Sequence, residues 1–338
     1  MPNRNLERRI HDLTLLGEWL GQTSTVELLA EKAHYANPWF TPENVRMAIN
    51  AVRPWLTIEQ LTSWTHPYRI EEHSGNTIGV IMAGNIPLAG FHDFLCVLIS
   101  GNKLKAKLSS QDSVLLSAIA EKLISIDSYW SQQIELAEQI KLVDAVIATG
   151  SNNTSRYFEY YFRNVPLLLR KNRTSVAVLR GDETEYERAG LRDDVLSYFG
   201  LGCRNVSLIF IPEKLSLEVI ASALYEGHRI LEHHKYANSY IYQRALLLMD
   251  QQPFTDTGFC ILRESDSPSS PVGVIHYQPY AEISSVHHWL ENHKEEIQCV
   301  VARDFPGAVA FGKAQHPGLT DYADHIDTLQ FLQGITES

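Results

Sequence analysis

Four cysteines are the residues of this chain with the clearest capacity for covalent chemistry: Cys96, Cys203, Cys260 and Cys299. No two of them form a CxxC pair and no apolar signal-peptide core precedes them, so we expect free thiols in a reducing cytoplasm. Cys96, Cys260 and Cys299 lie within or beside apolar runs, which is typical of core thiols. Glycines flank Cys203 in residues 200–205, where a substrate could approach closely and the neighbouring arginine could favour the thiolate. We therefore predict that Cys203 is a nucleophile, although a lone cysteine is more often structural.

Two further segments place polar side chains directly after predicted strands. Asn85 follows the apolar run 77–82 and could present an amide donor at the carboxyl edge of a sheet, where ligands bind in open α/β folds. Lys107, Ser109 and Ser110 follow the alternating run that starts at residue 103, and a lysine with two hydroxyls suits ribose or phosphate groups. Each feature alone is also what an ordinary turn or a solvated strand end contains.

A third segment, the turn 148–151, joins a predicted strand to a predicted helix, and its backbone amides could hold an anion with the help of the helix dipole. The better-known motifs are absent or incomplete. Residues 200–205 begin a dinucleotide fingerprint but lack its third glycine, and the near P-loop at 307–313 lacks the following hydroxyl that binds magnesium. The histidines between 228 and 234 do not share a helical face as metal ligands would, so we predict no metal site.

Alternating strands and helices must position these groups. The predicted strands are 77–82, 103–108, 143–150, 174–179, 206–212, 273–278 and 297–304, and the predicted helices are 88–100, 111–125, 152–162, 183–199, 214–232 and 281–294. Such alternation implies parallel sheets of the doubly wound kind. Residues 1–66 are predicted to be helical, with a helix start at Thr41 and Pro42, and residues 253–272 are predicted to form a long loop.

The composition bounds the class of protein. With 338 residues, 44% of them hydrophobic, the chain can form two globular domains. The net charge of -11 argues against a nucleic-acid binder, because phosphate contacts need clustered lysine and arginine. No apolar run approaches the roughly 18–20 residues of a membrane span, so we expect a cytoplasmic protein.

In their order along the chain, these segments resemble the aldehyde dehydrogenase superfamily. There, a strand ends near an Asn and a Pro, a Gly-Asn pair precedes a strand with a cofactor-binding Lys, and a Gly-Ser turn and a GxxC nucleophile loop follow. The matching residues here are Asn85 with Pro87, Gly101 and Asn102 with Lys107, Gly150 with Ser151, and Gly200 with Cys203. Each motif is weak alone, but the ordered set over residues 75–215 is fairly specific.

Within the superfamily the chain looks most like the long-chain acyl-CoA reductases, the Lux-type reductases of bacterial luminescence and their relatives. The signs are GNIP at 84–87, KLSSQD at 107–112, VDAVIATGS at 143–151 and the tail at 316–332. The resemblance implies two doubly wound parallel-sheet domains with an N-terminal helical segment. It divides the chain into the helical segment 1–66, a cofactor-binding domain 67–172, a catalytic domain 173–312 that carries Cys203, and a tail 313–338 that returns to the cofactor domain or to an oligomer interface.

Departures from the superfamily pattern bear on the reaction. Dehydrogenases that hydrolyse their acyl-enzyme carry a Glu base on the strand aligned with residues 167–173, where this chain has Arg170. Because a base activates water but is not needed when one thiol displaces another, this difference favours a thioester reductase. The ribose-binding Glu aligns with Ser110, which makes NADPH plausible beside NADH. The carboxylate expected near residues 265–272 for the nicotinamide ribose is not evident, and Glu264 is out of register.

The resemblance therefore implies NADPH- or NADH-dependent reduction of a long-chain acyl-CoA to the fatty aldehyde. Cys203 would form the acyl-enzyme, Asn85 and the backbone N–H of Cys203 would form the oxyanion hole, and the cofactor would contact Ala83, Gly84, Lys107, Ser109, Ser110, Gly150 and Ser151. A homo-oligomer is also implied, built through the hairpin-like segment 66–80 or the C-terminal tail, and so is a fatty-acid-activating partner protein. Two alternatives stay open: a non-catalytic binding subunit on a decayed dehydrogenase fold, and a reductase of an acyl phosphate or a carrier-bound thioester.

Overall fold

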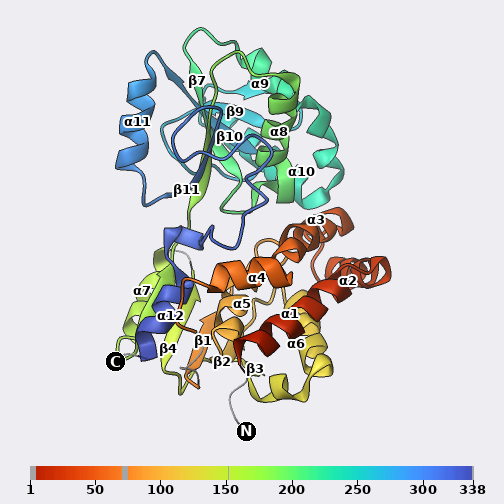
Figure 1. Ribbon diagram of the computed structural model, residues 1–338. Coiled ribbons are helices and arrows are strands. Elements are labelled where there is room, and N and C mark those ends of the chain that lie inside the picture. The colour runs from red at the N-terminus through yellow and green to blue at the C-terminus, as the bar shows by residue number, and fades with distance from the viewer. Residues whose placement is uncertain (1–4, 71–74, 151, 337–338) are drawn as a thin grey trace. The chain divides into compact units, whose positions relative to one another are not determined.

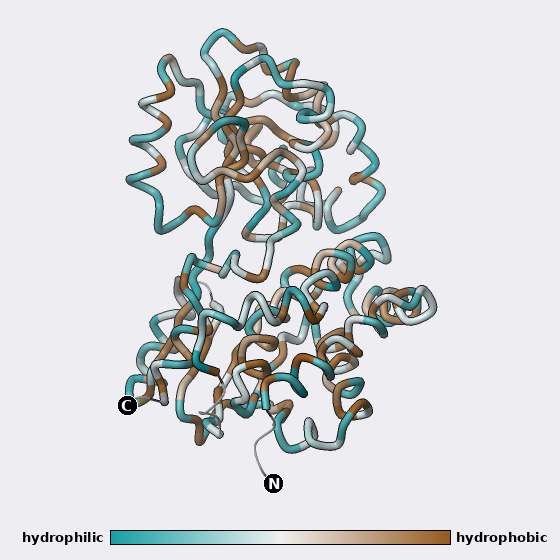
Figure 2. Tube along the Cα trace, viewed as in Figure 1, coloured by the Kyte–Doolittle hydropathy of each residue, from teal (hydrophilic) through white to brown (hydrophobic). Residues whose placement is uncertain are grey.

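The computed structural model describes residues 5–70, 75–150 and 152–336 and divides the chain into two compact units. Unit 1 comprises the chain up to Asn172 together with the segment from Gly318 onward, and unit 2 comprises Arg173–Pro317. Each unit contains one mainly parallel β-sheet with helices around it, so the predicted α/β class with two doubly wound sheets is confirmed (Figure 1). The hydrophobic residues concentrate on the strands and on the inner sides of the helices (Figure 2).

Five parallel strands form the sheet of unit 1, in the order β3-β2-β1-β4-β5. Their bounds are β1 Thr77–Ile81, β2 Lys103–Lys107, β3 Ile134–Leu136, β4 Ala145–Thr149 and β5 Leu167–Arg170. The strand order reverses between β1 and β4, and ligands bind at the carboxyl ends of strands beside such a reversal. Asn85 follows β1 and Gly150 follows β4, so both stand at this edge. The short β3 escapes prediction because a glutamate interrupts its apolar residues.

Helices lie on both faces of this sheet, with α5 and α6 on one face and α7 on the other (Figure 1). The N-terminal helix α1 packs against α5 and α6. The bounds are α1 Leu6–Leu20, α2 Thr23–Ala36, α3 Pro42–Val52, α4 Ile58–Thr65, α5 Phe91–Ile99, α6 Val114–Ile126, α7 Asn152–Tyr161 and α12 Thr328–Thr336. The predicted helix start is confirmed, since Thr41 Oγ1 accepts a hydrogen bond from Asn44 N at 3.3 Å and Pro42 is the first residue of α3.

The connection from β3 to β4, residues 137–144, is fully described and crosses the sheet without a helix. A helix rises only about 1.5 Å per residue, so a connection this short covers more distance in an extended conformation. Gly79 in β1 lets the connection lie directly on the sheet, because a Cβ at this position would come within 2.4 Å of Ile140 Cγ2.

A buried ion pair joins three distant parts of unit 1. At the end of β5, Arg170 donates from Nη2 and Nε to the two carboxylate oxygens of Asp93 in α5, at 2.7 and 3.0 Å. It also donates to the C-terminal segment, to Ala323 O at 2.5 Å and to Thr328 Oγ1 at 2.7 Å. Both charged residues are buried. Burial opposes ionisation of the Asp93 carboxyl, but the Arg170 charge outweighs it and holds the pKa of Asp93 below its ordinary value.

Aromatic hydroxyls continue this anchoring of the C-terminal segment. Trp64 Nε1 donates to the Tyr322 hydroxyl at 2.9 Å. The Tyr68 hydroxyl lies 2.9 Å from the same oxygen and donates to Asp327 Oδ2 at 2.6 Å. Helix α12 packs against α5. The segment after Gly318 is therefore part of the core of unit 1, although unit 2 separates it from the rest of that unit in the sequence.

Six strands form the sheet of unit 2, in the order β11-β6-β7-β10-β9-β8, and only β8 runs antiparallel to its neighbour. The strands are β6 Thr174–Val178, β7 Val206–Pro212, β8 Thr255–Asp256, β9 Ile261–Glu264, β10 Val274–Tyr280 and β11 Ile297–Ala302, and the helices are α8 Glu185–Leu196, α9 Leu217–Leu224, α10 His234–Met249 and α11 Ile283–Asn292. Leu191 of α8 and Ile220 of α9 belong to the core on one face of the sheet, and Val286 of α11 belongs to the core on the other.

Unit 2 departs from the sequence predictions in four segments. The predicted loop 253–272 contains β8 and β9, because the apolar residues at the start of β9 are fully buried beside β10. The predicted helix 183–199 ends at Leu196 and gives way to the 3-10 turn η3 (Ser197–Gly200). The predicted helix 214–232 is α9 followed by the 3-10 segment η4 (Tyr225–Glu232). Helix α10 escapes prediction because apolar residues lie on its exposed side as well as its buried side.

We expect Asp93→Asn to lower the free energy of unfolding by about 3–5 kcal/mol, because it leaves the buried Arg170 guanidinium without a counter-charge. Urea unfolding followed by circular dichroism measures this loss. The exposed pair Arg46–Glu27, with Nε and Oε1 2.8 Å apart, is the control, and Glu27→Gln should leave the unfolding midpoint unchanged. Equal midpoints for Asp93→Asn and the unaltered protein would contradict the importance of the buried pair.

Candidate active site

Cys203 is the one exposed thiol among the four cysteines, all of which lie in the described part of the chain. Cys96 and Cys260 are buried, as predicted. Burial raises the pKa of Cys260 to about 12 and the pKa of Cys96 well above its ordinary value, so both stay protonated and unreactive. The prediction for Cys299 is only partly right, because this residue is half-buried, with its sulfur 3.1 Å from Ser175 Oγ. Exposure therefore separates Cys203 from the other thiols.

The loop before Cys203 contains three successive left-handed residues. Residues 198–200 have φ angles of 50°, 61° and 74°, and the first two are costly because their side chains carry a Cβ. Asn205 holds this conformation: its Oδ1 accepts from Gly202 N at 2.8 Å, and its Nδ2 donates to Ser197 O at 2.8 Å. The side chain of Asn205 is buried. The backbone around the thiol is therefore fixed from both sides by one amide side chain.

Arg204 links the same loop to the end of unit 2. Its Nε donates to Ala314 O at 2.5 Å, while Asp194 in α8 accepts from Gly312 N at 2.6 Å and from Ala314 N at 3.0 Å. Burial raises the pKa of Asp194 to about 6, although both hydrogen bonds oppose this rise. These contacts hold residues 312–314 against α8, and unit 2 accordingly continues past residue 312 to Pro317.

In unit 1, the turn that carries Asn85 lies directly on the turn that carries Ser109. A Cβ on Gly84 would come within 2.5 Å of Ser109 Oγ, so glycine is required for this close approach. Met82 N donates to Lys107 O at 3.1 Å, which continues the pairing of the two strands beyond β1. The Asn85 side chain is exposed at this edge. The predicted oxyanion donor and the predicted cofactor-binding hydroxyl therefore belong to two turns in direct contact.

Asp112, the last residue of the KLSSQD segment and one without a predicted role, is a buried carboxylate beside these turns. Its Oδ2 accepts from Leu88 N at 2.7 Å, and it also accepts from the backbone of Leu115 in the first turn of α6. Only 2% of the residue is exposed, and its Oδ1 has no hydrogen-bond partner among the described residues. Burial raises the pKa of Asp112 to about 7. The sequence predicts a helix over 111–125 that contains Asp112, whereas in the structure α6 begins after the N-cap residue Ser113 and Asp112 precedes it.

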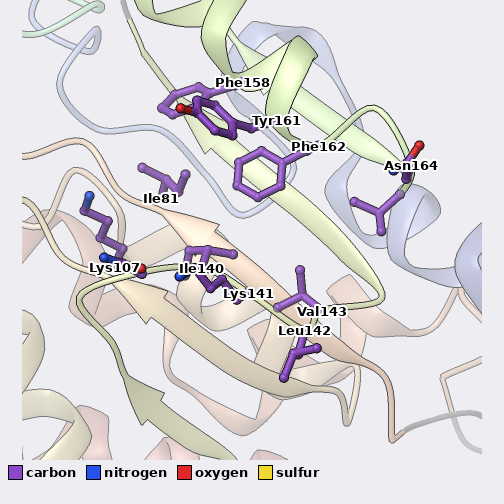
Figure 3. Close-up of a pocket in the computed structure, with 12 residues that line it drawn as sticks. Ile81, Lys107, Ile140, Lys141, Leu142, Val143, Phe158, Tyr161, Phe162 and Asn164 are labelled. Atoms are coloured by element: carbon purple, nitrogen blue, oxygen red, sulfur yellow. The ribbon is translucent and has the colours of Figure 1, made fainter.

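A pocket of about 680 Å³ lies in unit 1 beside Lys107 (Figure 3). It is lined by Ile81, Lys107, Gln139, Ile140, Lys141, Leu142, Val143, Phe158, Tyr161, Phe162, Asn164 and Val165. The extended connection between β3 and β4 forms one wall, and aromatic side chains from the end of α7 and the segment after it form another (Figure 3). All these lining residues are described, and none is acidic. Apolar and aromatic walls suit a nucleotide base, and two lysines without opposing carboxylates suit its phosphate groups.

The predicted cofactor residues of unit 1 cluster at one sheet edge. Lys107 lines the pocket, while Ala83, Gly84, Ser109 and Ser110 lie in the adjoining turns and Gly150 ends the neighbouring strand. Ser151 lies outside the described residues. Cys203 belongs to unit 2 and Asn85 to unit 1, so their pairing in one oxyanion hole stays a prediction. The influence of Arg204 on the thiol stays a prediction as well.

The strand expected to carry a hydrolytic base has none. Strand β5 is fully described and contains three leucines and Arg170, whose side chain is committed to Asp93 and the C-terminal segment. Asp93 is itself buried and neutralised by this contact. In unit 2, Glu264 ends β9 at the carboxyl edge of the sheet, whereas Cys203 precedes β7 at the opposite edge. Asp93 is therefore committed to Arg170, and Glu264 lies at the edge of the unit 2 sheet opposite the thiol.

Other kinds of site find no support in the described ranges. No three histidine, cysteine, aspartate or glutamate side chains of the described residues gather as metal ligands would. No helix within those residues combines the length and the apolar character needed to cross a membrane. Of the segments predicted to mediate assembly, 66–80 lies partly outside the described residues, and the described part of the tail includes helix α12.

Comparison with known proteins places this geometry in context. Residues 61–226 match the acyl-CoA reductase (LuxC) family. No curated protein sequence matches the chain. Among solved structures, a protein assigned as an aldehyde dehydrogenase from Burkholderia cenocepacia aligns with 90% of this chain and 76% of its own length, at 13% identity and a TM-score of 0.67.

Two structures with bound NAD+ have the same fold. The indole-3-acetaldehyde dehydrogenase AldA of P. syringae, solved with NAD+ and IAA, aligns with 92% of this chain and 75% of its own, at 11% identity and a TM-score of 0.68. The aldehyde dehydrogenase of Bacillus cereus, solved with NAD+, aligns with 88% of this chain and 72% of its own, at 13% identity and a TM-score of 0.64. At these identities the likeness concerns the fold alone.

The buried Asp112 carboxyl should make stability depend on pH. Because its pKa of about 7 in the folded protein exceeds the ordinary 3.8, its stabilising neutral form is complete below pH 3.8 and is lost as the pH rises to 7. Relative to Asp112→Asn, the free energy of unfolding should fall by up to about 1.4 kcal/mol per pH unit in this window. Urea unfolding at several pH values between 4 and 8 measures this slope.

The control for this experiment is Asp144, an exposed carboxylate that accepts from Thr77 N at 2.6 Å at the other end of β1. Asp144→Asn shows what the loss of one exposed carboxylate does to the same curve. If the curves for Asp112→Asn and the unaltered protein ran parallel, the assignment of a raised pKa to Asp112 would be wrong.

Proposed function

Residues 61–226 match the acyl-CoA reductase (LuxC) family and the chain has the fold of aldehyde dehydrogenases, and on that basis we propose that it is a reductase of this family that converts a long-chain acyl-CoA to the fatty aldehyde. The observation that carries this proposal is the exposed thiol of Cys203, on a loop whose strained backbone is held by Asn205. The alternative functions share this fold: one is reduction of a different electrophile, and the other is binding without catalysis.

In the proposed reaction the Cys203 thiolate attacks the carbonyl carbon of the thioester. A carbon–sulfur bond to the enzyme forms, and the CoA thiolate leaves and takes up a proton. The Asn85 side-chain amide and the backbone N–H of Cys203 donate to the carbonyl oxygen while it carries negative charge, and each such donor typically contributes about 2.7–4 kcal/mol. When bound, the nicotinamide cofactor supplies the hydride that reduces the acyl group. Cys203 then departs as the thiolate and the aldehyde is released.

The fate of the acyl-enzyme depends on what is missing around it. Hydrolysis needs a base to activate water. Strand β5 provides none, and Asp93 is held as a buried carboxylate by Arg170. An acyl group on Cys203 would therefore find no activated water from these residues and would persist until it is reduced or returned to a thiol. A long-lived acyl-enzyme suits a reductase of thioesters better than an oxidase of aldehydes.

The pocket beside Lys107 supports NADPH as the cofactor in this proposal. The adenosine would lie against the aromatic side chains from the α7 region, and a ribose phosphate would meet Lys107 and Lys141. Ser110 removes the carboxylate that would repel such a phosphate. In a chain with a net charge of -11, a pocket with two lysines and no acidic lining residue is selective for anions.

A cytoplasmic homo-oligomer that receives its acyl group from a fatty-acid-activating partner completes the proposal. A non-catalytic binding subunit, or a reductase of acyl phosphates or carrier-bound thioesters, would fit the same fold. Thermal unfolding with and without NADPH separates the first alternative, because a bound cofactor raises the midpoint. A substrate panel with one electrophile of each type separates the second.

Incubation with a long-chain acyl-CoA in the absence of reductant should add one acyl group to the protein, detected by mass spectrometry of the intact chain. Cys203→Ala should show no adduct and no reductase activity but should retain its NADPH-dependent rise in thermal midpoint. The control is Cys299→Ala, which removes the half-buried thiol and should leave the adduct in place. Full activity of Cys203→Ala would sink the proposed nucleophile.

Lys141→Ala should raise the dissociation constant for NADPH by about tenfold and leave that for NADH nearly unchanged, because one charge-assisted contact is worth about 1.5 kcal/mol. Fluorescence titration of the two cofactors measures the ratio. Lys105 is the matched control, because it lies on the same strand as Lys107 but does not line the pocket. Its Nζ pairs with Glu135 Oε1 at 3.0 Å. If Lys105→Ala changed the ratio of the NADPH and NADH dissociation constants as much as Lys141→Ala does, the phosphate site would be contradicted.

A further inference from the structure

Asp112 stands between the two turns of unit 1 that the proposed reaction uses. Its backbone belongs to the turn that begins at Ser109, where Asp112 N donates to Ser109 O at 3.1 Å. Its side chain reaches the other turn, where Oδ2 accepts from Leu88 N at 2.7 Å. One residue thus joins the proposed cofactor hydroxyls to the segment that carries Asn85.

The segment from Asn85 to Leu88 is short and stiff, so a contact at Leu88 controls Asn85. Pro87 has a fixed φ and restricts the residue before it. Leu88 has a φ of 60°, a left-handed conformation that is costly for a leucine. Its N–H is held by Asp112, and Phe91 N donates to Leu88 O at 3.0 Å. The carboxylate therefore supports a backbone conformation that leucine would otherwise leave.

The surroundings of Asp112 exceed what a helix cap requires. A cap needs one side-chain oxygen at the first turn of the helix. Asp112 is 2% exposed, makes the additional contact with Leu88, and keeps a second oxygen without a partner among the described residues. The turn is also anchored from behind, because Asn37 Nδ2 donates to Gln111 O at 3.1 Å. Burying a carboxylate with one oxygen unsatisfied is costly, so capping alone does not account for Asp112.

We propose that Asp112 is a positioning residue that holds the Asn85 loop in register with the cofactor-binding turn. The inference rests on the proposed function, since it assigns Asp112 an effect that acts through the Asn85 amide. Asp112 itself touches neither thioester nor cofactor. It sets where the Asn85 donor stands when the turn at Ser109 and Ser110 is occupied.

Steady-state kinetics of acyl-CoA reduction test this role. Asp112→Ala should lower kcat by about ten- to a hundredfold, a part of the loss of about 10²–10³ expected when an oxyanion donor is removed altogether. KM for the cofactor should change less than about threefold, because the lysine contacts remain. Asp112→Asn keeps an acceptor oxygen for Leu88 and should retain most of kcat.

Asp112→Ser separates positioning from capping. Serine keeps an oxygen that can cap α6 but is one atom too short to replace the carboxylate contact with Leu88. The proposal expects its kcat to fall as in Asp112→Ala while its thermal midpoint stays nearer to that of the unaltered protein. A kcat equal to that of the unaltered protein in Asp112→Ser would reduce Asp112 to a cap. Asp144→Ala, which removes another carboxylate that holds a backbone N–H of unit 1, should leave kcat unchanged.

A double-mutant cycle shows whether the effect passes through Asn85. In the Asn85→Ala background, Asp112→Ala should lower kcat no further, because the donor that it positions is gone. The proposal would be overturned if the fold losses in kcat of the two single variants multiplied in the double variant. Unaltered kinetics of Asp112→Ala would overturn it as well. If the unaltered protein reduced no acyl-CoA at all, the proposed function itself would fail, and that result is distinct from either of these.

Discussion

The buried ion pair of Arg170 and Asp93 is the interaction on which the arrangement of unit 1 depends. The chain leaves unit 1 just after Arg170 and returns at Gly318, so this unit is assembled from two separate parts of the sequence. Arg170 contacts α5 through Asp93 and the returning segment through Ala323 and Thr328. An apolar pair of similar shape could fill the same space, but it would lack the directed hydrogen bonds that join β5, α5 and the returning segment.

The two units solve the problem of placing a functional group by different means. In unit 2 the backbone does it: left-handed residues 198–200 and the amide of Asn205 shape the loop, and Cys203 is carried at its exposed end. In unit 1 a side chain does it, because Asp112 holds a turn that its own helix does not contain. Strained backbone lies beside Cys203, and a carboxylate oxygen without a described partner lies beside the Asn85 segment. Such costs are common where geometry matters more than stability.

Most helices and strands can be predicted from the sequence, whereas contacts between residues far apart in the sequence cannot. The strands at 77–82, 143–150 and 206–212 are predictable because apolar runs between turns have few other uses. Strand β9 is missed because proline and serine around it suggest a loop, while its pairing with β10 depends on residues further along the chain. Cys203 stands out by its glycines, whereas Asp112 and Asp194 do not, because their partners at Leu88 and Ala314 are far away in sequence. Arg170 is noticed in the sequence only because it stands where hydrolytic dehydrogenases have a Glu base. No pattern in the neighbouring residues indicates its ion pair with Asp93.

Gly79 carries a consequence for how this fold can vary. Its missing side chain lets the extended connection 137–144 rest on the middle of the sheet, with Ile140 in the space that a Cβ would fill. A longer connection would fold into a helix about 10 Å across, whose axis would stand farther from the strands. A side chain at position 79 would push Ile140 off the sheet, so the glycine lets this short connection lie closer to the strands than a packed helix could.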